Sequence, residues 1–156
     1  MKSDDSLRRH LVEALDNSHA HLRFDDVIGR WPLKLRGRKA RGAPHTAWQL
    51  LEHMRIAQWD ILDFCRNPNY VSLEFPEGYW PVSATPPSQS AWTRSVRQLR
   101  ADLQAMKELV ANPATDLHAR IPHGEGQTIL REALLAADHN AYHLGQLYLL
   151  RRLLGA

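Results

Sequence analysis

The segment from Thr128 to Leu147 reads TILREALLAADHNAYHLGQL, and it decides how the rest of the chain is interpreted. Its apolar residues recur at helical spacing, which predicts a helix that starts near Thr128 and continues to Leu154. With about 100° of rotation per residue, His139 and His143 fall on a face that is otherwise largely apolar. Both histidines are therefore expected to point into the protein interior.

A third histidine is expected to share that interior. His53 lies in the segment WQLLEHM, residues 48–54, where helical spacing places it on a core-facing apolar stripe. Helical residues four apart lie about 5–6 Å from each other, so His139 and His143 can reach one metal ion while His53 arrives from a facing helix. Because burying even one unpartnered imidazole is costly, three buried histidines favour a metal site with an open coordination position.

The remaining pattern predicts an all-α protein, a four-helix bundle with long irregular connections in one domain over residues 1–156. The expected helices cover 3–28, 46–66, 90–111 and 128–154. Thr46 and Gln49 match a capping box at the start of the second helix, and Asn67-Pro68 ends it. With 44% hydrophobic residues, a chain of 156 residues can build a core without metal or disulfides.

Between the second and third helices, residues 67–88 contain five prolines and four aromatic residues. Prolines disfavour regular structure here, while the aromatic side chains offer apolar bulk that can cover a site. We expect this segment to act as a covering loop, with Tyr79 and Trp80 in a wall over the metal and in contact with substrate. Gln146 is a further candidate for substrate binding because it lies on the histidine face of the last helix.

The positive charge is concentrated in one segment. Residues 30–42 carry six basic residues and no acidic one, so the other 14 bases are outnumbered by 17 acids. Three interpretations are open: a solvated mobile loop, a lip that binds an anionic substrate or thiol cofactor through Arg36 and Arg38, or a nucleic-acid contact. Nucleic acid is the least favoured, because Trp31 is the single aromatic residue in the segment.

The other compositional features indicate a cytoplasmic protein. Cys65 is the only cysteine, which excludes an internal disulfide and favours a reducing compartment. The first residues lack the apolar core of a signal peptide, and no stretch approaches the roughly 18 apolar residues of a membrane span.

With these residues in view, the chain resembles the DinB-like (DinB/YfiT) superfamily over nearly its whole length. The resemblance rests on the 128–147 run, on the 48–54 segment, and on the H-x-G-Q ending at His143-Leu-Gly-Gln146. It implies a four-helix bundle, often dimeric, that holds a divalent metal. The positions that match the family's ligands are His53, His139 and His143.

The resemblance also implies classes of activity without choosing among them. The leading expectation is a transferase that activates a low-molecular-weight thiol, of the bacillithiol or mycothiol kind, or water for attack on a small electrophilic substrate. The alternatives are a metal-dependent hydrolase at the same site and a non-catalytic stress-response binding protein. Zinc or nickel suits three imidazoles best. No catalytic residue beyond the ligands can be named from the sequence.

A homodimer is expected from the back of the last helix. Ala137, Ala141 and Gly145 recur every four residues there, between Leu134 and Tyr148. Small residues at this spacing let another helix approach closely, whether from the first helix of the same chain or from a second subunit.

Overall fold

A computed structural model of the chain describes residues 3–16, 20–29 and 31–156. Over these residues the regular structure is helical, apart from an isolated bridge between Arg120 and Thr128. The elements are α1 (Ser3–Leu15), α2 (Phe24–Ile28), η1 (Leu33–Leu35), α3 (Ala47–Arg66), η2 (Glu77–Tyr79), α4 (Gln89–Ala111) and α5 (Ile129–Leu153), where η marks a short 3-10 helix. The all-α fold predicted from the sequence is confirmed.

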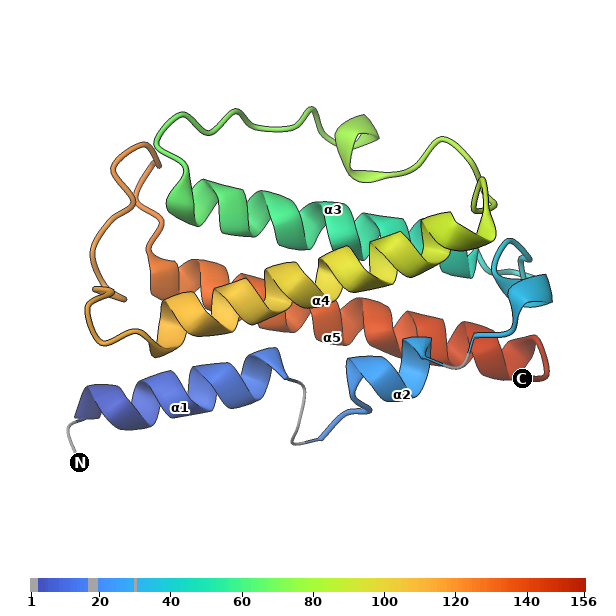
Figure 1. Cartoon of the computed structure of the whole chain (residues 1–156), viewed down its shortest axis with the longest axis horizontal. Helices are drawn as coiled ribbons and strands as arrows, with labels where there is room; N and C mark the ends of the chain where they lie inside the picture. Colours follow the sequence, from blue (N-terminus) through green and yellow to red (C-terminus); the bar gives the residue numbers. More distant parts are fainter. Residues whose placement is uncertain (1–2, 17–19, 30) are drawn as a thin grey trace.

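Three long helices, α3, α4 and α5, form the body of the protein. Helix α3 packs against both α4 and α5, while α1 packs against α4 and α5 and α2 packs against α5. Figure 1 shows α1 and α2 following one another along α5, so that together they take the place of the first helix of the bundle. The 67–88 segment passes along the outside of α3 and contains one 3-10 turn, as an irregular connection should.

The prediction of one first helix over residues 3–28 is wrong. Helix α1 ends at Leu15, residues 20–23 are not helical, and residues 17–19 lie outside the described part. Leu22, an apolar residue within the predicted helix, is 44% exposed. The physical reason is tertiary: α1 buries Leu11 and Leu15 in one apolar cluster, whereas α2 buries its apolar residues in another. Arg151 of α5 also donates to the backbone carbonyl oxygens of Asp26 and Val27 in α2, at 3.1 Å each, which adds a contact between α2 and α5.

The start of α3 follows the capping box predicted from the sequence, and the structure adds a cap at the start of α5. The Thr46 hydroxyl accepts from the Gln49 amide at 3.2 Å, and the Gln49 side chain accepts from the Thr46 amide at 3.0 Å, which completes the capping box. Thr128 caps α5 by accepting from the backbone N–H of Arg131 at 3.2 Å. These local bonds satisfy backbone donors that a helix start leaves free.

The core is divided into two apolar clusters with a polar layer between them. One cluster contains Leu51 and Leu147, and the other contains Ile61 and Ala133. Between these levels the buried Asn140 side chain donates to Gln58 at 2.7 Å. His139 precedes Asn140 on α5, whereas His53 and His143 adjoin Met54 and Leu144 of the first cluster. The fold therefore places the candidate site between two long helices, where apolar packing on either side holds it.

In the described part of the chain, no helix combines the length and the apolar character needed to cross a membrane.

Candidate metal centre

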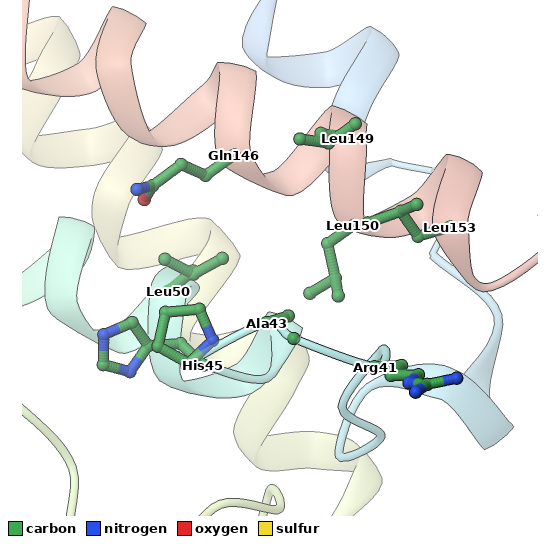
Figure 2. Close-up of a pocket in the computed structure, with 10 residues that line it drawn as sticks. Arg41, Ala43, His45, Leu50, Gln146, Leu149, Leu150 and Leu153 are labelled. Carbon is green, nitrogen blue, oxygen red and sulfur yellow. The ribbon is translucent and has the colours of Figure 1, made fainter.

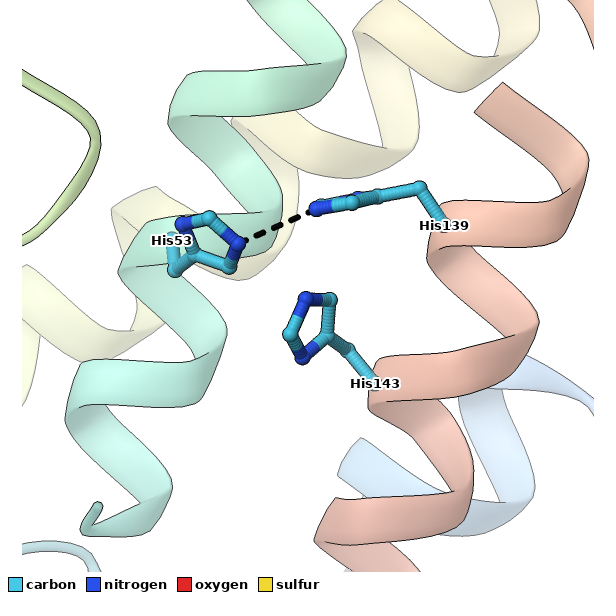
Figure 3. Close-up of side chains that lie close together, drawn as sticks. All are labelled: His53, His139 and His143. Atoms are coloured by element: carbon cyan, nitrogen blue, oxygen red, sulfur yellow. Dashed lines mark hydrogen bonds between the residues drawn. The ribbon is translucent and has the colours of Figure 1, made fainter. Parts of the chain in front are cut away.

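The structure brings together the three histidines selected from the sequence. His53 projects from α3, and His139 and His143 project from successive turns of α5 toward it (Figure 3). One ring nitrogen of each histidine lies within 4.8 Å of the others, and the Nε2 atoms of His53 and His139 are 3.0 Å apart. His53 and His143 are buried and His139 is half-buried.

Two of the three imidazole rings are held by hydrogen bonds at Nδ1. Nδ1 of His53 lies 2.9 Å from the Tyr79 carbonyl oxygen, and Nδ1 of His143 lies 2.7 Å from the side-chain oxygen of Gln146. Because both partners are acceptors, each Nδ1 must carry the proton and donate it. This fixes the tautomer in which Nε2 presents a lone pair, the arrangement that metal-binding histidines use.

The surroundings keep the imidazoles neutral. Burial is the main cause of a lowered pKa at all three histidines. The pKa is about 3 for His139 and about 4 for His143. Repulsion between the neighbouring rings acts in the same direction, whereas the hydrogen bond from His143 to Gln146 opposes it. A neutral imidazole can donate its lone pair to a metal without first losing a proton.

The donor set fits a divalent metal. Two nitrogens that share a tetrahedral zinc at 2.0–2.1 Å lie about 3.3 Å apart, close to the separation of the His53 and His139 Nε2 atoms. Three imidazoles also leave at least one coordination position for water or substrate. A closed structural zinc site uses four protein ligands, so the three histidines fall one ligand short of that arrangement.

Comparison with protein families agrees with this geometry. The model of the DinB superfamily matches residues 6–147, which include all three histidines. The chain belongs to the DinB superfamily. Comparison with curated proteins and with solved structures gave no match.

In this DinB superfamily member, Trp80 lies directly beside the histidines. Its ring stacks on His53 at 3.9 Å between centroids and 1° between planes, and His45 stacks on it at 4.1 Å and 18°. Trp80 is therefore held between two imidazoles, one of which belongs to the candidate centre. The sequence did not single out His45, because it precedes α3 and belongs to no helical periodicity.

Tyr79 faces a different neighbour. Its carbonyl contacts His53, but its hydroxyl donates to the buried Asp60 carboxylate at 2.7 Å, and Tyr70 donates to the same carboxylate at 2.9 Å. Burial and the Asp60 hydrogen bond raise the pKa of Tyr79. Asp60 thus anchors the covering segment and, through Tyr79, the orientation of His53.

We expect Asp60→Ala to weaken metal binding by about 10- to 100-fold, the usual effect of losing an outer hydrogen bond to a metal ligand. The affinity is measured by competition with a chelator. Asp63→Ala on the same helix is the matched control, because in the described part of the chain its carboxylate accepts from the Asn67 side chain and not from Tyr79. Equal affinity in the two variants would show that Asp60 does not position His53.

The other predicted contact residues divide into near and remote ones. Gln146 lines a pocket of about 300 Å³ (Figure 2). None of the three histidines lines this pocket, and one link between them is the hydrogen bond from His143 to Gln146. Arg36 instead lies over the Trp92 ring at 4.7 Å, and Arg38 is exposed and does not line the pocket. The basic residue that lines it is Arg41. Arg30, the first base of the segment, lies outside the described residues.

Proposed function

We propose that the protein is a metal-dependent enzyme that activates a low-molecular-weight thiol or water for attack on a small electrophilic substrate. His53, His139 and His143 would hold the divalent ion, with zinc or nickel the best match to this ligand set. The proposal rests on the convergence of three neutral imidazoles beside a pocket. When bound, such an ion lowers the pKa of a thiol or water ligand to near neutral.

The chain's own residues supply orientation and shielding. Gln146 holds His143 in place and also lines the pocket, so it lies where a substrate would contact it. Trp80 covers one face of His53 and limits access of water from that side. A reacting molecule would therefore approach from the pocket and not through the covering segment.

The composition of the cluster favours a thiol over water. The group of ligating side chains found among the described residues contains histidines and no carboxylate. Attack by water benefits from a nearby general base that takes its proton, whereas a thiol can lose its proton to solvent before it reacts. In the proposed step the sulfur forms a bond to the electrophilic carbon, and the leaving group departs with its electron pair.

Metal content and thiol transfer test the proposal together. Protein purified without an affinity tag is analysed for metal, loaded with zinc or nickel, and assayed for consumption of low-molecular-weight thiols and of an activated ester. We expect metal-dependent thiol transfer that His139→Ala abolishes and that His118→Ala, at an exposed histidine, leaves unchanged. Ester hydrolysis without thiol transfer would favour the hydrolase, and the absence of metal would refute the proposal.

We also propose a homodimer through the exposed face of α5. Leu134 is 52% exposed and Tyr142 is 63% exposed, and a side chain added at Gly145 would meet nothing within 4 Å. Ala137, by contrast, is buried inside the bundle. Of the small residues in the predicted stripe, Gly145 is therefore the one that leaves room for a second copy.

Charge complementarity supports a two-fold contact centred on Gly145. Asp138 and Arg152 lie seven residues before and after it, both are exposed, and neither forms an ion pair within the described residues. Seven residues are close to two helical turns, so all three share one face of α5. In an antiparallel pair of α5 helices, a two-fold axis at Gly145 would place each Asp138 opposite Arg152 of the second copy.

We expect Asp138→Arg to weaken the dimer by roughly tenfold or more, because it replaces two attractive contacts by two repulsive ones. The double variant Asp138→Arg/Arg152→Asp should restore association. Sedimentation or light scattering across a concentration series measures the effect. A monomeric wild-type protein at micromolar concentration, or a double variant no better than the single one, would contradict this contact.

A further inference from the structure

We propose that the pocket beside the histidines binds a substrate that combines an apolar chain with one anionic group. We call it the leucine pocket, after Leu50 of α3 and Leu149, Leu150 and Leu153 of α5. The claim that it is a binding site depends only on the residues that line it. Its role as the substrate site rests on the proposed function.

The leucine pocket has two chemically different ends. Figure 2 shows Gln146 at one side and Arg41 at the other, with Leu50 and Leu150 between them. Gln146 bonds to His143, and His45, which also lines the pocket, stacks on the Trp80 ring that covers His53. A molecule in the pocket would therefore have one end next to the candidate metal centre and the other next to Arg41.

The charge of the lining selects an anion. Arg41 is its only residue with a permanent charge, and it forms no ion pair within the described residues. Burial lowers the pKa of His45 and Lys39 lowers it further, so both disfavour a positive charge on that ring. A carboxylate or another single anion would therefore find its partner at the Arg41 end.

The leucines select an apolar chain. Leu149 is 58% exposed and Leu153 is 59% exposed, although both border a concave site. A hydrocarbon chain lying against them would remove apolar surface from water on both molecules. Each buried methylene should raise affinity by roughly fourfold. An exposed ion pair contributes about as much as one buried methylene, so a chain of several methylenes should supply most of the affinity and Arg41 should supply the preference for an anion.

Titration with straight-chain carboxylates tests the leucine pocket. Butanoate, hexanoate and octanoate are titrated by calorimetry into metal-free and metal-loaded protein. We expect saturable binding of one molecule per chain, with affinity rising roughly fourfold per added methylene until the pocket is filled. Leu153→Ser, at an exposed position, should reduce this dependence on chain length without unfolding the protein. Affinity that is independent of chain length would overturn the proposal.

A charge reversal tests the anionic end. Arg41→Glu should weaken octanoate binding and turn the preference for octanoate over octylamine into its opposite. Arg38→Glu is the matched control, because it makes the same change in the same segment outside the pocket lining. Equal effects of the two variants would show that Arg41 has no specific role.

These experiments distinguish failure of the pocket proposal from failure of the proposed function. Octanoate binding that depends on chain length and on Arg41, in a protein without metal or thiol transfer, would leave the pocket standing and refute the proposed function. Metal-dependent thiol transfer without octanoate binding would support the proposed function and refute the pocket proposal.

Discussion

Replacing His143 by alanine should lower the affinity for a divalent ion by roughly a thousandfold while leaving the helices folded. Loss of one of three ligands removes several kcal/mol of metal binding, and about 4 kcal/mol corresponds to that factor. The fold should persist because two apolar clusters, on either side of the polar layer, form the core without using the ion. Chelator competition measures the affinity, and far-ultraviolet circular dichroism measures the helix content.

The matched control for this prediction is His118→Ala. His118 is exposed and lies outside the histidine cluster, so its removal should change neither metal content nor helicity. Full metal occupancy in His143→Ala would show that the ligand assignment is wrong. Loss of helicity would instead show that the metal has a structural role.

The parts of the fold that follow from local rules could be predicted from the sequence. The Thr46 capping box, the stop at Asn67 and the start of the last helix near Thr128 depend on residues at most a few positions apart, and all three are found in the structure. The packing of α1 and α2 as separate helices depends instead on contacts distant in sequence, such as the one from Arg151, more than 120 residues away, to the carbonyls of α2. No local pattern contains that contact.

The candidate site shows the same division. His139 and His143 are four apart on one helix, and His53 joins them because each lies on a core-facing stripe of its own helix. The outer contacts could not be predicted in this way: Asp60 acts on His53 only through Tyr79, and His45 reaches the site only through Trp80. These contacts depend on how the 67–88 segment lies over α3, and the irregular backbone of that segment carries no periodic signal.

The metal-free protein should lose stability in mild acid because of the same buried histidines. In an unfolded chain a histidine titrates near pH 6.5, whereas folding lowers the pKa of His143 to about 4 and that of His139 to about 3, mainly by burial. Above pH 6.5 both states are neutral and the histidines add no pH dependence. Between pH 6.5 and these lower values the unfolded chain takes up protons that the folded protein excludes, so the free energy of unfolding falls as pH falls. His143 alone should account for roughly 2 kcal/mol of this loss by pH 5.

Urea unfolding in the presence of a chelator, at pH 7, 6 and 5, measures this dependence. The double variant His139→Gln/His143→Gln carries side chains that stay neutral at every pH, so its free energy of unfolding should fall less between pH 7 and pH 5 than that of the wild type. His118→Gln removes an exposed histidine and should keep the wild-type slope. The difference in slope identifies the cause, because other titrating groups remain in all three proteins. Parallel slopes for the wild type and the double variant would mean that the folded protein accepts protons at this cluster. The three imidazoles would then not be held neutral, and the ligand set would bind metal only in competition with protons near neutral pH.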